Sequence, residues 1–102
     1  MQTTEEETKE SKLIRFVRRI TENVDFPNID NLAKVVDPNP NLFENMIGVV
    51  SAAYHLGERG LELQPGVYSY LPGLNSEELK PFLEGVHKQG RTKSGRLKTY
   101  PS

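Results

Sequence analysis

The sequence contains no cysteine among its 102 residues. This absence excludes a disulfide framework, a thiolate metal site, an iron–sulfur cluster and a cysteine nucleophile. The longest apolar stretch, Met46 to Tyr54, is broken by Gly48 and Ser51 and is far shorter than the ~20 residues of a membrane-spanning helix. The acidic start of the chain also lacks the basic-then-apolar order of a secretion signal. We therefore expect a cytoplasmic protein, of cellular, viral or plasmid origin, that has no membrane partner.

Acidic residues are missing from the C-terminal end of the chain. Glu84 is the last of the 14 acidic residues, whereas five of the 13 basic residues follow it. The net charge of −1 at pH 7 therefore conceals a chain that is acidic in front and basic at its end. Such asymmetry is typical of a tail that binds an anionic partner. The five cations of this tail are Lys88, Arg91, Lys93, Arg96 and Lys98.

Sequence patterns of catalysis are missing as well. The chain has no G-x-S-x-G nucleophile motif, no phosphate-binding loop and no dinucleotide fingerprint. Glu84 and His87 share the Glu-x-x-His spacing of four-helix di-iron proteins. His55 and Glu58 form the reverse order, and we interpret both histidines as surface residues. The sequence thus predicts a protein without enzymatic activity, metal or cofactor.

Apolar residues that recur every three or four positions predict three helices in the first part of the chain. The first runs from about residue 4 to about residue 24 and ends before Pro27, because the residue before a proline avoids helical geometry. The second is short, is capped at Asn28 or Asp30, and runs through Val36. The third runs from about Pro40 to about Arg59. It is apolar on most of its circumference, and we therefore expect it at the centre of the core.

The rest of the chain predicts an extended segment and a fourth helix. Alternation around Tyr68 and Tyr70 has the period of a strand, so residues 61–74 form either a short hairpin or an extended loop. The fourth helix begins near Asn75 with a kink at Pro81, or begins near Pro81 itself, and ends at Gly90. The expected fold is all-α, or mainly α with one short β-hairpin. It is a compact bundle of about four helices in one domain, residues 1–90, with a flexible basic tail, residues 91–102.

The basic tail is the first candidate site. Its five cations suit the phosphates of nucleic acid, and Tyr100 is placed to stack on a base. The alternatives are an acidic protein surface as the partner, or a solvated end without a specific partner.

A second candidate site is formed by Tyr68, Tyr70 and Leu71. Tyrosines on an extended segment offer a large contact area with few rotatable bonds. In the alternative interpretation, one tyrosine packs over the third helix as part of the core. Together, the two sites predict a small regulatory, accessory or assembly protein. It docks on a protein partner and contacts nucleic acid or an acidic surface with its tail, and homo-oligomerisation is compatible with this interpretation.

Residues 29–47 resemble a helix-turn-helix motif. The resemblance implies a DNA-binding regulator, acting as a dimer, in which Asn41 and Asn45 read base edges. The chain differs from the motif in two respects. Asp37 and Pro38 replace the usual glycine of the turn, and no Lys or Arg lies between Lys34 and Arg59, although recognition helices normally use such residues.

Overall fold

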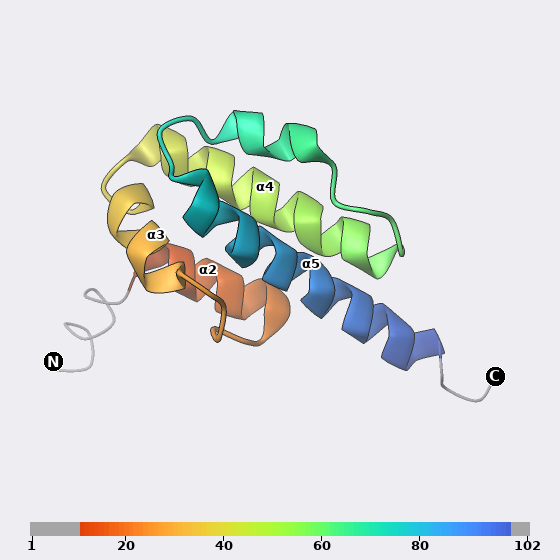
Figure 1. Cartoon of the computed structure of the whole chain (residues 1–102). Helices are drawn as coiled ribbons and strands as arrows, with labels where there is room; N and C mark the ends of the chain where they lie inside the picture. Colours follow the sequence, from red (N-terminus) through yellow and green to blue (C-terminus); the bar gives the residue numbers. More distant parts are fainter. Residues whose placement is uncertain (1–10, 99–102) are drawn as a thin grey trace, which may run out of the picture.

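The computed structural model describes the backbone of residues 11–98 and the side chains of residues 11–93, and this part of the chain is mainly helical (Figure 1). It contains the α-helices α2 (Lys12–Thr21), α3 (Ile29–Val36), α4 (Pro40–Glu58) and α5 (Ser76–Lys98), and the 3₁₀ helix η1 (Pro65–Tyr70). No β-strand occurs within residues 11–98. The predicted mainly helical fold is confirmed.

Helix α2 begins later and ends earlier than predicted. Ser11 has non-helical backbone angles, and its hydroxyl accepts a hydrogen bond from the amide of Ile14 at 3.1 Å. This N-cap contradicts one continuous helix from residue 4, and the predicted part before Ser11 lies outside the described residues. At the other end, Glu22 adopts a left-handed conformation with φ of 62°. The Thr21 hydroxyl donates to a backbone oxygen, which stabilises this early end.

Helices α3 and α4 agree with the predicted ranges. Asn39 caps α4 as its side-chain oxygen accepts from the amide of Leu42 at 3.2 Å, and Pro40 follows in the first turn. Asn28 precedes α3 without a side-chain cap, because its amide group instead donates to the backbone oxygen of Glu78 at 3.1 Å. Asp37, directly after α3, accepts from the first two amides of α2. Local sequence thus fixes these helices, and two side chains connect them to distant elements.

The central position predicted for α4 is confirmed. This helix contacts all four other helices of the described range, and its buried side chains lie at helical spacing over its whole length. Figure 1 shows that α4 and α5 run in the same direction, and that the segment between them, which contains η1, returns along α4. The core includes Leu13 and Val17 of α2, Leu32 and Val36 of α3, Met46 and Val50 of α4, and Leu79, Phe82, Leu83 and Val86 of α5.

The predicted strand pattern in residues 61–74 is wrong, because the segment forms the 3₁₀ helix η1. The amide of Val67 donates to the Gln64 oxygen and the amide of Leu71 donates to the Tyr68 oxygen, each over three residues and at 3.2 Å. Val67, Tyr68 and Leu71 consequently turn toward the core. A 3₁₀ turn brings residues three apart to one side, so the alternation in the sequence does not correspond to two faces of a sheet.

Helix α5 starts near Asn75, as one of the two predicted alternatives had it. The Asn75 side chain accepts from the amide of Glu77 at 2.9 Å, and Pro81 lies inside the helix. The predicted stop at Gly90 is wrong, since α5 continues to Lys98. Residues 91–98 of the predicted tail are therefore helical. Residues 99–102 lie outside the described residues.

Gly90 is instead a packing residue. A β-carbon at Gly90 would collide with the backbone oxygen of Tyr54 in α4, and one at Gly57 would collide with the backbone oxygen of His87 in α5. Glycine at both positions therefore lets the two helices cross at close range. A glycine inside a helix costs roughly 0.5–1 kcal/mol relative to alanine, a cost that close packing can offset. Gly60, by contrast, follows α4 with φ of 73°, as expected of a glycine that ends a helix.

Candidate nucleic-acid interface

The C-terminal end of α5 extends beyond the helix that supports it. Gly90 packs against the last turn of α4, which ends at Glu58. Residues 91–98 add about two further turns to α5, and Figure 1 shows this end projecting past α4. Of the predicted basic residues, Lys88 lies just before Gly90, and Arg91, Lys93, Arg96 and Lys98 lie on this last part of α5.

Four residues of α5, His87, Lys88, Arg91 and Thr92, line an open hollow of about 420 Å³. Lys88 and Arg91 are both exposed and lie three residues apart, on one face of the helix. The Thr92 hydroxyl donates to the backbone oxygen of Lys88 at 3.0 Å. No carboxylate belongs to the lining of this hollow among the residues that the structure describes. The hollow therefore presents two cations and a hydroxyl to solvent.

His87 connects this surface to the loop after α4. Its Nε2 lies 2.7 Å from the backbone oxygen of Leu61. A carbonyl oxygen only accepts, so Nε2 donates this hydrogen bond. Nδ1 is the other ring nitrogen and accepts in the neutral tautomer. The contact fixes the imidazole at one edge of the hollow. The sequence predicted His87 to be a surface histidine rather than a metal ligand, but it did not place His87 or Thr92 beside the basic residues. Their spacing from Lys88 was the available signal, and for Thr92 it required α5 to continue beyond Gly90.

The predicted basic residues do not form one continuous group. Lys88 and Arg91 meet at the hollow, whereas Lys93 is half-buried and lies on another side of the helix. Arg96 and Lys98 occupy the last turn of α5. Tyr100 lies outside the described residues.

The three residues of the predicted docking site differ in how far they are buried and do not form one exposed surface. Leu71 is 2 % exposed and belongs to the core, so its prediction as a contact residue is wrong. Tyr68 is half-buried and packs against the core. Its burial raises the pKa of the phenol above 10.0, and the nearby Glu84 carboxylate adds to this rise. Tyr70 is 64 % exposed. A strand would have placed Tyr68 and Tyr70 on the same face. In the 3₁₀ helix they lie on different sides, one half-buried and one exposed.

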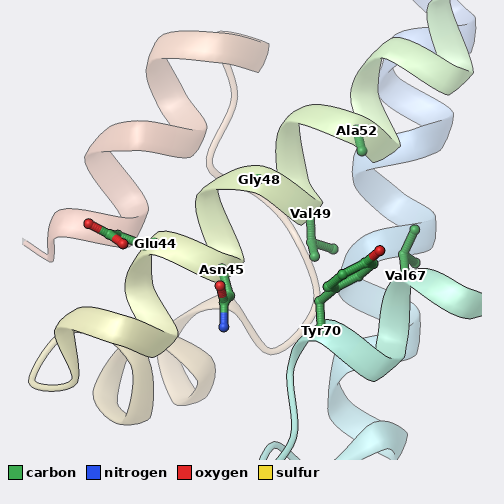
Figure 2. A pocket seen from close by; sticks show the side chains of 7 residues that line it. All are labelled: Glu44, Asn45, Gly48, Val49, Ala52, Val67 and Tyr70. Carbon is green, nitrogen blue, oxygen red and sulfur yellow. The ribbon is translucent and has the colours of Figure 1, made fainter.

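Tyr70 lies over a groove of about 280 Å³ between α4 and η1. Figure 2 shows its ring between Val49 and Val67, with Gly48 and Ala52 along α4 and Glu44 at the opposite end, directed away. A β-carbon at Gly48 would meet no atom within 4 Å. The groove is therefore lined mostly by apolar groups, and no side chain covers it at Gly48.

Helices α3 and α4, with the turn between them, occupy the region that resembles a helix-turn-helix motif. Asn41, Glu44 and Asn45 are exposed near the start of α4. Leu42 and Met46 are buried. The exposed strip therefore carries a carboxylate where a recognition helix needs donors for phosphates and guanines.

Among the side chains that the structure describes, neither histidine lies in a group of potential metal ligands. His55 Nδ1 is 3.0 Å from a carboxylate oxygen of Glu58, and His87 contacts a backbone oxygen. Within the described part of the chain, no three His, Asp or Glu side chains come close enough together to hold a metal ion. In the same part, no helix combines the length and the apolar character needed to cross a membrane.

Comparison with known proteins gives no family for this chain. No protein-family model matches it, and no curated protein or solved structure shows significant similarity to it.

Proposed function

We propose that this protein is a non-catalytic binding protein whose α5 end contacts the phosphate backbone of nucleic acid. One observation carries the proposal: Lys88 and Arg91 line the same open hollow, on a helix that projects beyond α4. Arginine can donate two parallel hydrogen bonds to a phosphate, and lysine adds a mobile charge. The Thr92 side chain beside them is small and leaves room for an anion.

The distribution of charge along α5 favours a polymer with repeated phosphates over a single anion. From Lys88 to Lys98 the helix rises by about 15 Å, and basic residues recur along that whole length. Duplex DNA likewise carries its charges at short, regular intervals. The neighbouring amide side chain, Gln89, accepts a hydrogen bond from Asn23. The interface therefore suits binding to the backbone without selection of a base sequence.

The test measures binding of a fluorescently labelled nucleic acid to the full chain over a series of salt concentrations. The variant Lys88→Gln/Arg91→Gln removes the two cations of the hollow. We expect weaker binding and a salt slope reduced by about two, one for each lost phosphate contact. The matched control, Lys34→Gln/Lys80→Gln, removes the same charge from two exposed positions elsewhere and should bind as the natural chain does. Absence of binding, or an equal loss in both variants, would contradict the proposal.

A second candidate function is the docking of a protein partner at the groove between α4 and η1. The exposed Tyr70 ring beside a mostly apolar groove favours it, because rigid aromatic side chains often anchor interfaces. Selection from a displayed peptide library should enrich peptides with one large apolar residue. These peptides should lose affinity for Tyr70→Ala and keep it for Lys80→Gln. Equal affinity for both variants would contradict docking at this groove.

A further inference from the structure

We infer that the projecting end of α5 enters the major groove of B-form duplex DNA. The inference rests on the proposed function and names the form of nucleic acid that this end of the helix binds. It depends on where α5 leaves the body and on how its cations are placed around the helix axis.

The first argument is one of size. An α-helix with its side chains is about 10–12 Å across, and the major groove of B-form DNA is about 12 Å wide and 8.5 Å deep. A helix packed in a bundle presents only its exposed face to such a groove. The backbone of Gly90 and Arg91 packs against the last turn of α4, and α5 continues beyond that contact to Lys98. Its last two turns therefore have the length and the free approach that insertion requires.

The second argument is the placement of the cations on two flanks. Arg91 and Lys93 are two residues apart in a continuous helix, and each lies about 100° around its axis from Thr92, which is exposed and small. Arg91 is exposed and Lys93 is half-buried. A flat anionic surface contacts one flank of a helix. The major groove has a phosphate strand on each side, so Arg91 and Lys93 match opposite walls while Thr92 faces the floor.

The same geometry disfavours the other forms of nucleic acid. The major groove of an RNA duplex is deep and too narrow for protein side chains to read, so the helix cannot enter it. A single strand has no second phosphate wall for the second flank of the helix to contact.

The experiment compares the full chain on four labelled probes: a DNA duplex, an RNA duplex of the same sequence, one DNA strand alone, and polyglutamate. We expect the chain to bind the DNA duplex at least about tenfold more tightly than each of the other three probes at equal salt. Equal affinity for the three nucleic acids would overturn the groove inference and leave the proposed function in place. Absence of binding to nucleic acid, or tighter binding of polyglutamate, would overturn both.

Single variants test the two flanks. Arg91→Gln and Lys93→Gln should each lower the salt slope on the DNA duplex by about one. Circular dichroism of each variant confirms that it is folded. An effect of Arg91→Gln without any effect of Lys93→Gln would show contact with one flank only and would overturn the inference. A dye that occupies the major groove should compete with the protein, and failure to compete would overturn it as well.

Discussion

Gly57 and Gly90 lie at the crossing of α4 and α5, and each leaves room for the backbone of the opposite helix. The contact is reciprocal, since Gly57 faces the His87 oxygen while Gly90 faces the Tyr54 oxygen. It positions the projecting end of α5 relative to the body. The packing of these two glycines therefore affects both stability and the proposed interface.

Replacing Gly90 by alanine should destabilise the fold by about 1–3 kcal/mol, because the added methyl group forces the helices apart. Urea unfolding followed by circular dichroism measures this change. The matched control is Gly48→Ala, where a β-carbon meets no atom within 4 Å. That variant should be stabilised by about 0.4–1 kcal/mol, since alanine loses less backbone freedom on folding. Equal effects of the two variants would contradict the packing role of Gly90.

Asp37 should contribute to stability through the start of α2. Its carboxylate oxygens accept from the amides of Lys12 and Leu13 at 3.2 and 3.1 Å, groups that have no partner within the helix. Asp37→Ala should cost about 1 kcal/mol, as the loss of a helix cap does. Asp25→Ala, at an exposed position, should change the free energy of unfolding by less than about 0.5 kcal/mol. A smaller effect at Asp37 than at Asp25 would show that these bonds do not hold α2.

The ionisation of Tyr68 should make the protein less stable in alkali. Burial raises its pKa above the usual 10.0, and the Glu84 charge raises it further. Above pH 10 the unfolded chain therefore loses this proton first, and stability falls as pH rises through the folded-state pKa. Tyr68→Phe should flatten this fall in urea unfolding measured as a function of pH.

Phenolate absorbance gives an independent measurement of the same group. Glu84→Gln should lower the pKa of Tyr68, because it removes the neighbouring negative charge. Glu77→Gln, an exposed carboxylate on the same helix, serves as the control and should leave that titration in place. An unchanged titration after Glu84→Gln would assign the whole shift to burial.

Tyr70, the last residue of η1, and Leu71, which follows it, should respond very differently to truncation. Leu71 is 2 % exposed and Tyr70 is 64 % exposed. Leu71→Ala should cost about 2–5 kcal/mol, as deletion of a core leucine does. Tyr70→Ala should change stability by less than about 0.5 kcal/mol. Thermal unfolding of the two variants measures this difference, and equal losses would place both side chains in the core.

The elements that could be predicted from sequence are those fixed by neighbouring residues. Asn39 and Pro40 begin α4 through local capping geometry, and Asn75 begins α5 in the same way. The alternation around Tyr68 resembled a strand because apolar spacing in a short segment does not distinguish a strand from a 3₁₀ turn. Only the packing of Val67, Tyr68 and Leu71 against the core decides between them.

The candidate site was predicted in part, for a related reason. The positive charge of Lys88 and Arg91 was evident from composition. Their shared hollow was not, because it requires α5 to continue past Gly90. A glycine near the end of an apolar pattern usually indicates a helix end. Here its role depends on the Tyr54 oxygen, which belongs to a helix that is distant in sequence.

The parallel direction of α4 and α5 has a consequence for the order of folding. Two antiparallel helices can associate as soon as a short turn joins them. For α4 and α5 to meet, the segment that connects them, which contains η1, must first fold back along α4 (Figure 1). The loop-closure entropy of that return precedes any gain from the Gly57–Gly90 crossing. This crossing should therefore form late, after local helix formation in α4, and the end of α5 should gain its fixed orientation in the same late step.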